Sequence, residues 1–322
     1  MDQISILTIG DSSCDNILEV SEQDTGFQCD LKSHKCEITF NYGEKIPVRR
    51  VHLGHGGSAL NCAAGFRKLG LSAKIATIIG NDDPGKGIIR FLHERGIGLN
   101  LLKVAGETNL ATIISYKGER TIFSYHALRD YNLIALEKAD WVYFASAGQG
   151  SDILIREVLN FKNSGSKLVF NPGAWQLKNF SKFKDLVKNC DAFIINRVEA
   201  DLILGEVGKI RSQLQKMCEM GAKIAVITDG KNGAYFSSSG NSIHLNATVA
   251  QNIDSTGAGD AFSSGFIGAL AMGKSLEESA KWGMVNSGSA IEKFTASAGL
   301  LNTAQIEERI SQIKSFKATI LS

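Results

Sequence analysis

The chain has 322 residues and a formal net charge of +2, with 33 glycines and only 3 prolines. This length suits one large α/β domain or two smaller ones. A charge so close to zero provides no strong field to recruit nucleic acid or an anionic membrane, so we expect neither as a partner.

No apolar run is long enough to cross a membrane, and the first residues lack the basic and apolar blocks of a signal peptide. The six cysteines are scattered without paired spacing, which is typical of a chain kept in a reducing compartment. Together these features predict a cytoplasmic protein.

Short apolar runs alternate with helical patterns along most of the chain. The first run covers 5–10, and others follow at 73–79, 141–145, 167–171, 192–195 and 224–228. Such alternation predicts a doubly wound, mainly parallel sheet with helices on both faces, in a single α/β domain spanning 1–322. Ligands bind outside the carboxyl ends of such strands, so Asp11, which follows the first run, is a candidate ligand residue unless it only caps a turn.

The segment from about 18 to 51 breaks this alternation. Polar and β-favouring residues alternate there without a helical period, and a turn signal follows at 41–43. A hairpin is predicted farther along, with strands at 111–116 and 121–125. We expect these segments to form a small, partly exposed β-sheet, which is either a lid over a ligand or a decorative insertion.

Two short patterns are compatible with ligand binding. Gly56 and Gly57 would let a bulky polyol approach the backbone, and Asn61 can donate to and accept from hydroxyls, although a loop before a helix explains them equally. Asn196 and Glu199 directly follow a predicted strand. A carboxylate there can reach a Mg²⁺–phosphate group through water, although helix capping also suits the pair.

The most informative stretch, 253–262, reads as a turn running into a helix. The backbone N–H groups of Gly257, Ala258 and Gly259 would lie unpaired at the helix start, where partial positive charge binds phosphate or a developing oxyanion. Asp260 would repel a stored phosphate, but during transfer it could take a proton from an attacking hydroxyl. The alternative is an acidic residue that stabilises a helix dipole after an ordinary turn.

The nonapeptide 254–262 closely resembles the C-terminal signature of the ribokinase-like (PfkB) carbohydrate kinases, and Ser255 is its only departure from that signature. Gly-Gly-x-x-x-Asn-x-Ala at 56–63, Asn-x-x-Glu at 196–199 and Thr-x-Gly-x-x-Gly at 228–233 resemble three further family motifs, in family order. The resemblance implies a ribokinase-like fold with a β-sheet lid. It also implies ATP-dependent phosphorylation of a hydroxyl of a sugar or sugar-like substrate.

The resemblance implies a role for each matching residue. The catalytic group would comprise Asp260 as the base and the amides of Gly257, Ala258 and Gly259 as the anion hole. The sugar would contact Asp11, Gly56, Gly57 and Asn61, with Tyr125 and Arg129 from the segment after the hairpin. The nucleotide side would comprise Asn196, Glu199, Thr228, Gly230 and Gly233, with Asn286, on a helix expected at 276–294, beside adenine. Glu199 would organise Mg²⁺ through water, and Asp254 with Thr256 would hold K⁺ if the chain binds it.

Two alternatives stay open. The same fold phosphorylates nucleosides, so a nucleoside kinase is the alternative within the enzyme class. A non-catalytic sugar- or nucleotide-binding regulator is disfavoured because Asp260, the anion hole and Glu199 are all present. Ser58 stands where ribokinases proper often have lysine, which weakens the case for ribose itself. Because the family often pairs its lids, we also expect a homodimer through the lid.

Overall fold

The computed structural model describes residues 3–21, 26–30, 35–117, 119–313, 316 and 318–321. Its main sheet has ten strands in the order β16-β15-β14-β13-β12-β11-β10-β1-β6-β7. The strands are β1 (Ser5–Ile9), β6 (Ser72–Ile79), β7 (Leu102–Val104), β10 (Trp141–Phe144), β11 (Lys167–Phe170), β12 (Ala192–Asn196), β13 (Ile224–Thr228), β14 (Ala234–Ser238), β15 (Asn241–Leu245) and β16 (Ala318–Ile320). Pairing from β7 to β13 is parallel, and β14 to β16 add an antiparallel edge. The predicted mainly parallel sheet is therefore confirmed.

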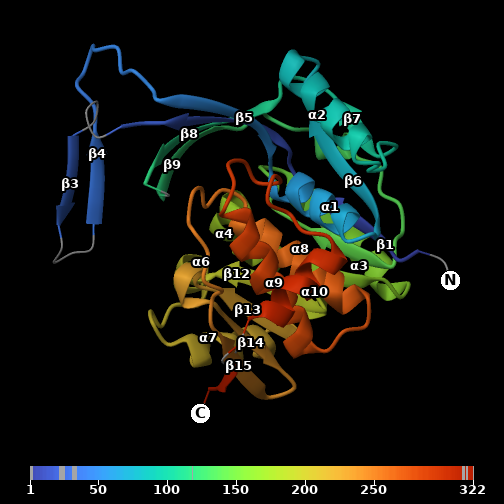
Figure 1. Ribbon diagram of the computed structural model, residues 1–322. Helices are drawn as coiled ribbons and strands as arrows, with labels where there is room; N and C mark the ends of the chain where they lie inside the picture. The colour runs from blue at the N-terminus through green and yellow to red at the C-terminus, as the bar shows by residue number, and fades with distance from the viewer. Residues whose placement is uncertain are drawn as a thin grey trace.

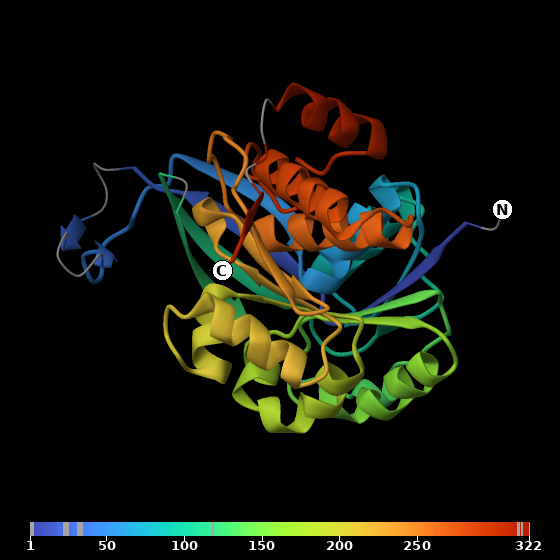
Figure 2. The same cartoon turned by 90° about the horizontal axis from the view of Figure 1, so that it is seen from below.

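Helices cover both faces of this sheet (Figures 1 and 2). One layer contains α1 (Ser58–Lys68), α2 (Asp83–Glu94), α8 (Ala258–Ala271), α9 (Leu276–Ala290) and, outside α9, α10 (Thr303–Gln312). The other contains α3 (Ile155–Asn163), α4 (Ala174–Lys178), α5 (Lys184–Asn189), α6 (Arg197–Leu204) and α7 (Ile210–Glu219). Short 3₁₀ turns lie at η1 (Tyr131–Leu133), η2 (Ser151–Leu154), η3 (Phe180–Phe183) and η4 (Gly230–Asn232). Successive strand residues serve opposite layers: Ile6 packs under the first and Leu7 under the second.

Helix α9 ends at Ala290, four residues before the predicted end at 294. The carbonyl of Ile291 accepts hydrogen bonds from the N–H groups of Ile253 (2.8 Å) and Asp254 (3.2 Å). The segment before α8 is thus bonded to the residue that caps the end of α9, and a turn begins there beside the predicted catalytic loop.

A separate sheet of four strands stands over one end of the main sheet, in the order β5-β2-β8-β9 (Figure 1). Its strands are β2 (Ser13–Glu19), β5 (Arg50–Gly56), β8 (Asn109–Tyr116) and β9 (Glu119–Tyr125). It starts earlier than the predicted residue 18, because the chain leaves β1 through Gly10 (φ 151°) and enters β2 almost at once. Within the predicted segment, 22–25 and 31–34 lie outside the described residues, as does Gly118 in the hairpin turn.

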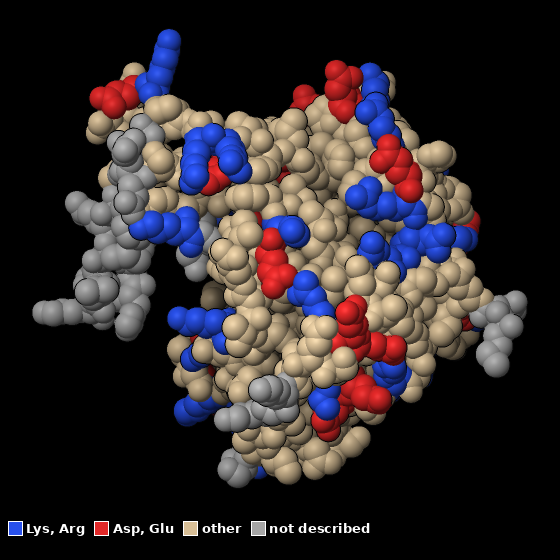
Figure 3. Space-filling model, in the orientation of Figure 1, with Lys and Arg blue, Asp and Glu red and all other residues tan. Residues whose placement is uncertain are grey.

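Two further strands, β3 (Gly26–Asp30) and β4 (Lys35–Thr39), form a hairpin that stands away from the body of the molecule (Figure 1). Within the described ranges, no helix combines the length and apolar character needed to cross a membrane. On the face drawn in Figure 3, basic and acidic side chains are interspersed.

Candidate active site

A cavity of about 260 Å³ opens between the carboxyl ends of β11, β12 and β13 and the start of α8. Predicted residues from several distant motifs meet here, as the rule for parallel sheets requires. The lining residues are Ser58, Arg120, Ser146, Asn171, Pro172, Gly173, Ile194, Ile195, Asn196, Glu199, Thr228, Gly257, Gly259, Asp260 and Ser263.

The start of α8 provides the predicted anion-binding amides. Gly257 precedes the helix in the left-handed conformation (φ 76°), and a Cβ atom there would lie 2.3 Å from the Cβ of Ala296. Only glycine fits both the conformation and the space. Gly257 and Gly259 line the cavity, whereas Ala258 does not, and its N–H lies 3.3 Å from the carbonyl of Ser255. The amides of the two glycines are therefore the better placed donors.

Asp260 lies in the first turn of α8, and its Oδ2 accepts a hydrogen bond of 2.7 Å from Nδ2 of Asn61 on α1. Burial raises the pKa of the Asp260 carboxyl, while hydrogen bonds from Asn61 and Ser58 and the charge of Arg120 act against this rise. A carboxylate with a raised pKa beside anion-binding amides suits a general base near neutral pH. Arg120 reaches the cavity from β9 of the small sheet, a contact that the sequence did not predict.

Asp11 is buried beyond the end of β1, with firmly held carboxylate oxygens. Tyr131 donates its hydroxyl to Oδ1 at 2.7 Å, and the N–H of Gly148 donates to Oδ2 at 3.0 Å. Burial raises the pKa of Asp11 despite these donors and despite the charges of Arg129 and His126. Sequence reasoning missed Tyr131 and Gly148, although both follow predicted elements closely enough to be candidates.

Asp15 is the most informative residue that sequence reasoning missed. It lies buried on β2, where Ser13 donates its hydroxyl to Oδ1 at 3.0 Å. Burial, together with the negative charges of Asp260 and Asp254, raises the pKa of Asp15 to about 6, despite the hydrogen bond from Ser13. The available signal was that polar residues recur at every second position, Asp11, Ser13 and Asp15, because alternate residues of a strand share a face.

The predicted glycine pair lies against the side chain of Asp15 and the backbone of Asp11. A Cβ atom at Gly56 would meet Oδ2 of Asp15 at 2.2 Å, and one at Gly57 (φ 94°) would meet the carbonyl of Asp11 at 2.3 Å. The two glycines therefore make room for the aspartates and shape the pocket.

Tyr125 and Arg129 are both bonded to other residues of the chain. Tyr125 pairs with Leu110 and so faces the side of the small sheet opposite to Asp15, which pairs with Ala111. Its hydroxyl donates a hydrogen bond to Oε2 of Glu107 (2.5 Å), and its sugar contact stays a prediction. Arg129 donates to the carbonyl of Ala105 (3.2 Å) and to Oδ1 of Asn109 (3.0 Å), while its buried Nε has no partner in the described structure.

On the nucleotide side, Asn196 and Glu199 form a reciprocal capping box at the start of α6. Oδ1 of Asn196 accepts from the N–H of Glu199 at 2.9 Å, and Oε2 of Glu199 accepts from the N–H of Asn196 at 2.8 Å. Burial raises the pKa of Glu199 despite these bonds, and the charge of Asp260 adds to the rise. The pair thus caps the helix and lines the cavity at once.

Thr228 also lines the cavity, whereas Gly230 (φ 51°) and Gly233 (φ 94°) shape the turn behind it. Asn286 does not reach the cavity lining. It is 1% exposed, donates to the carbonyl of Ala261 at 2.8 Å and accepts from the N–H of Leu301 at 3.0 Å. These bonds join α8 and α9 to the chain before α10, so Asn286 has a packing role here, and its adenine contact stays a prediction.

Asp254 and Thr256 hold the turn before α8. Oδ1 of Asp254 accepts from the N–H (3.0 Å) and the hydroxyl (2.7 Å) of Thr256, and Oδ2 accepts from the N–H of Thr295 at 3.3 Å. This geometry is the one expected if Asp254 bonds turn amides without an ion. Among the described residues, no group of three or more His, Cys, Asp or Glu side chains is arranged to hold a metal.

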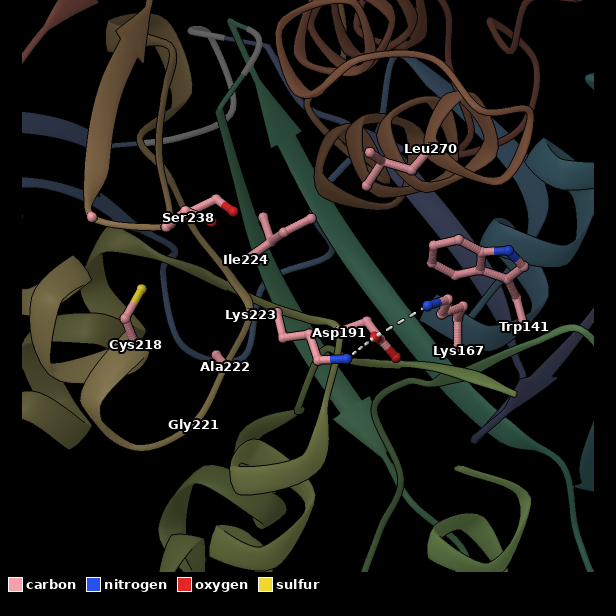
Figure 4. Close-up of a pocket in the computed structure, with 12 residues that line it drawn as sticks. Trp141, Lys167, Asp191, Cys218, Gly221, Ala222, Lys223, Ile224, Ser238 and Leu270 are labelled. Carbon is pink, nitrogen blue, oxygen red and sulfur yellow. Dashed lines mark hydrogen bonds and ion pairs between the residues drawn. The ribbon is translucent and has the colours of Figure 1, made fainter. Parts of the chain in front are cut away.

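A second hollow, of about 630 Å³, lies at the amino edge of the main sheet (Figure 4). Asp191 lies there between Lys167 and Lys223, at 3.9 and 3.0 Å from their Nζ atoms, and also contacts Lys162. None of the predicted site residues lines this hollow.

The family model described as pfkB family carbohydrate kinase matches residues 24–303. The ATP-dependent 6-phosphofructokinase of Thermoanaerobacterium thermosaccharolyticum is 27% identical over 267 residues, covering 76% of this chain and 81% of that protein. The nucleoside kinase of Methanocaldococcus jannaschii has a similar solved structure, with a TM-score of 0.77, 20% identity and 96% and 98% of the two chains covered.

The ribokinase of Arabidopsis thaliana, solved with ribose and ATP, has a TM-score of 0.74 at 19% identity, with 96% of this chain and 98% of that chain covered. These structures establish the ribokinase-like fold, and the family match extends over most of the chain. The chain therefore belongs to the pfkB family of carbohydrate kinases.

Proposed function

We propose that Asp260 is the general base of an ATP-dependent transfer of phosphate to a hydroxyl of a sugar or sugar-like substrate. The observation that carries this proposal is the position of the Asp260 carboxyl in one cavity with the start of α8. Its raised pKa suits proton uptake near neutral pH. A non-catalytic regulator would have no need for a desolvated carboxylate beside anion-binding amides.

In the proposed step, Asp260 accepts the proton of the acceptor hydroxyl. A bond forms between the hydroxyl oxygen and the γ-phosphorus of ATP, while the bond to the departing ADP oxygen breaks. The amides of Gly257 and Gly259 stabilise charge on the transferred group, and Arg120 adds a positive charge at the same cavity. The proton remains on Asp260, and the leaving negative charge departs with ADP.

Mg²⁺ fits the nucleotide side. Glu199 lines the cavity and commits Oε2 to the backbone of Asn196, which leaves its other oxygen for a water that binds the ion. A bound Mg²⁺ would neutralise charge on the ATP phosphates and oppose the burial that raises the pKa of Glu199. We assign Glu199 and Asn196 to this role.

We assign the acceptor hydroxyls to Asp11, Asp15 and Asn61. Asp11 and Asp15 are both buried, and the charge of Asp260 acts on Asp15; such carboxylates favour an acceptor that donates hydrogen bonds, as the hydroxyls of sugars and nucleosides do. A nucleoside therefore stays the alternative acceptor. An acceptor with its own phosphate would bring like charge toward Asp11 and Asp15, with Arg129 nearby as a counter-charge.

A coupled assay of ADP formation over sugars, nucleosides and sugar phosphates, each at the same concentration, tests this assignment. We expect ADP formation that depends on an uncharged hydroxyl acceptor and that Asp260→Asn lowers by about 10²-fold or more. Acceptor-dependent ADP formation within a few-fold of the parent's after this substitution would overturn the proposed base. Preference for a sugar phosphate over its parent sugar would overturn the assignment of the carboxylates.

The four-stranded sheet is the proposed lid, and its outer face is the proposed dimer contact. The strand register places Val51, Leu53, Phe123 and Tyr125 on that face, where they are 54%, 75%, 61% and 50% exposed. Such a patch of large apolar side chains is typical of an interface. Sedimentation should show a dimer that Leu53→Asp with Phe123→Asp converts to monomers, and a monomeric parent would contradict the proposal.

Two further expectations concern conditions. We propose that K⁺ activates the enzyme from a site beside Asp254 and Thr256, where it would share oxygens that already accept protein donors. The initial rate at fixed ionic strength should then be higher with K⁺ than with Na⁺ or tetramethylammonium, and equal rates would contradict the proposal.

A reducing, cytoplasmic location is supported by four free cysteines among the described residues, Cys14, Cys62, Cys190 and Cys218.

A further inference from the structure

The turn after α9 contacts the lid through Phe294. The ring of Phe294 stacks on His52 of β5, with centroids 3.8 Å apart and planes 12° from parallel. It also packs against the apolar inner face of the lid, formed by Ile17, Ala111 and Ile113. The lid therefore rests on this turn.

The next residue, Thr295, touches both the lid and the catalytic loop. A Cβ atom at Gly54 of β5 would lie 3.0 Å from Cγ2 of Thr295, and the N–H of Thr295 donates to Oδ2 of Asp254 at 3.3 Å. Thr295 has φ 72°, a left-handed conformation that β-branched residues avoid. Such strain persists when surrounding contacts hold the backbone in place, and it gathers at functional sites.

The third residue, Ala296, is buried against the anion hole. A Cβ atom at Gly257 would lie 2.3 Å from the Cβ and 2.7 Å from the Cα of Ala296. Asp254, held from the other side by Thr295, accepts from the N–H and hydroxyl of Thr256. Two independent contacts thus lead from this turn to the residues that present the amides of Gly257 and Gly259.

We propose that the turn 294–296 couples docking of the lid to the geometry of the anion hole, with Phe294 as the positioning residue. This inference rests on the proposed function, since the coupled amides are those assigned to the transferred phosphoryl group. With the lid raised, Phe294 loses its stacking partner, and the strained Thr295 relaxes. Asp254 and Ala296 then hold Thr256 and Gly257 less tightly, so the amides are aligned only when the lid covers the acceptor.

The coupling has a direct chemical use. An anion hole that is complete only under a closed lid favours transfer to the acceptor over transfer to water. The acceptor site under the lid and the phosphate site at the anion hole would then be linked through a contiguous set of packed and hydrogen-bonded residues. Binding of either substrate would shift the conformation of this set.

Hydrogen exchange of the substrate-free protein tests the coupling without any knowledge of the acceptor. His52→Ala changes only the lid, and it should raise exchange in the peptide covering 254–259 at least threefold. In a Phe294→Ala background the same His52→Ala change should add nothing, because the connection is already broken. Phe294→Tyr keeps the ring and should restore the parent's exchange.

Phe180→Ala is the matched control, because Phe180 is also a partly buried ring, stacked on Phe193 in the opposite helical layer at 6.0 Å. It should leave exchange at 254–259 unchanged. If His52→Ala loosens β5 but leaves 254–259 as in the parent, the coupling is wrong. The coupling is also wrong if the effects of His52→Ala and Phe294→Ala on that peptide add independently.

Activity supplies a second, separate measurement. The measured quantity is the ratio of the rate of ATP hydrolysis without acceptor to the rate of acceptor phosphorylation. This ratio should rise at least fivefold in Phe294→Ala and should not rise in Phe294→Tyr. An unchanged ratio in an active Phe294→Ala enzyme would overturn the coupling and leave the proposed function intact. Failure of the proposed function itself would instead show as a parent protein that is inactive with every acceptor.

Discussion

Buried carboxylates at the two edges of the main sheet have pKa values that are shifted in opposite directions. At the carboxyl edge, burial raises the pKa of Asp15, Asp260 and Glu199, and their mutual repulsion adds to the rise at Asp15 and Glu199. At the amino edge, burial also acts on Asp191, but hydrogen bonds from Lys162, the N–H of Leu168 and Lys223 hold its pKa below the ordinary value.

The difference separates a working site from a structural one. Three lysines neutralise Asp191, of which Figure 4 shows Lys167 and Lys223. The bonds of Asp191 join the amino ends of neighbouring strands. The carboxylates at the other edge have no lysine or arginine within ion-pair distance in the described structure. Clustered and desolvated charges of this kind destabilise a fold, so their presence indicates a task that needs them.

Asp191→Asn tests whether the carboxylate at the amino edge stabilises the fold. It leaves Lys162, whose side chain is 16% exposed, without its partner, while the more exposed Lys167 and Lys223 regain water. We expect a loss of about 2–3 kcal/mol in unfolding free energy at pH 7, since removal of one buried partner is costly and exposed partners add little. The turnover of the folded enzyme should not change.

Chemical denaturation with a parallel turnover assay measures both effects. The pKa of Asp191 is depressed in the folded state, so its contribution is present above its ordinary pKa of 3.8 and is lost as pH falls through the folded value. The stability difference between parent and variant should therefore shrink in acid. A variant as stable as the parent at pH 7 would show that the lysines do not stabilise this edge.

Asp15→Asn tests the opposite edge and should stabilise the protein. The pKa of Asp15 rises from 3.8 to about 6 on folding, so its ionisation destabilises the folded state: the penalty begins above pH 3.8 and is complete above pH 6. By linkage, the gain in unfolding free energy should approach about 3 kcal/mol at pH 8 and vanish near pH 4.

The same variant should lose affinity for the acceptor, because an amide replaces the carboxylate that we assign to accept its hydroxyls. Thermal unfolding at pH 8 and at pH 5, with the acceptor KM, checks the prediction. A gain that is larger at pH 5 than at pH 8 would show that Asp15 is not desolvated as described.

Glu199→Gln should have a smaller effect, confined to the nucleotide side. The amide can keep the capping bond to the N–H of Asn196 but loses the charge assigned to Mg²⁺. We expect a several-fold increase in the Mg²⁺ concentration needed for half-maximal rate and no change in the acceptor KM. A Mg²⁺ titration that overlays the parent's, together with a raised acceptor KM, would place Glu199 on the other substrate.

Much of the fold and part of the site could be predicted because their signals are local. The glycine turn before α8 and the capping pair at Asn196 lie within a few residues of the strands and helices they join. Asp15 and Tyr131 were missed because their roles depend on how the small sheet pairs and where η1 places a ring, which no local pattern encodes. The same sheet register also turned Tyr125 to the outer face.

Asn286 shows a further limit of local patterns. Its helix was predicted, but whether an asparagine faces a ligand or a neighbouring helix depends on the packing of α8 against α9, where Nδ2 finds the carbonyl of Ala261. The contacts of Phe294 were likewise inaccessible to sequence reasoning, since they join a turn near the end of the chain to strands near its beginning.

The most direct test of the central claim compares turnover and nucleotide binding in Asp260→Asn. The asparagine keeps the shape of the side chain and can keep a bond to Asn61, but it cannot accept the proton of the acceptor. We predict a fall in kcat of about 10²–10⁴-fold, the usual contribution of a general base, with the ATP dissociation constant unchanged within about twofold. A kcat within a few-fold of the parent, with normal ATP binding, would contradict the assignment of Asp260 as the base.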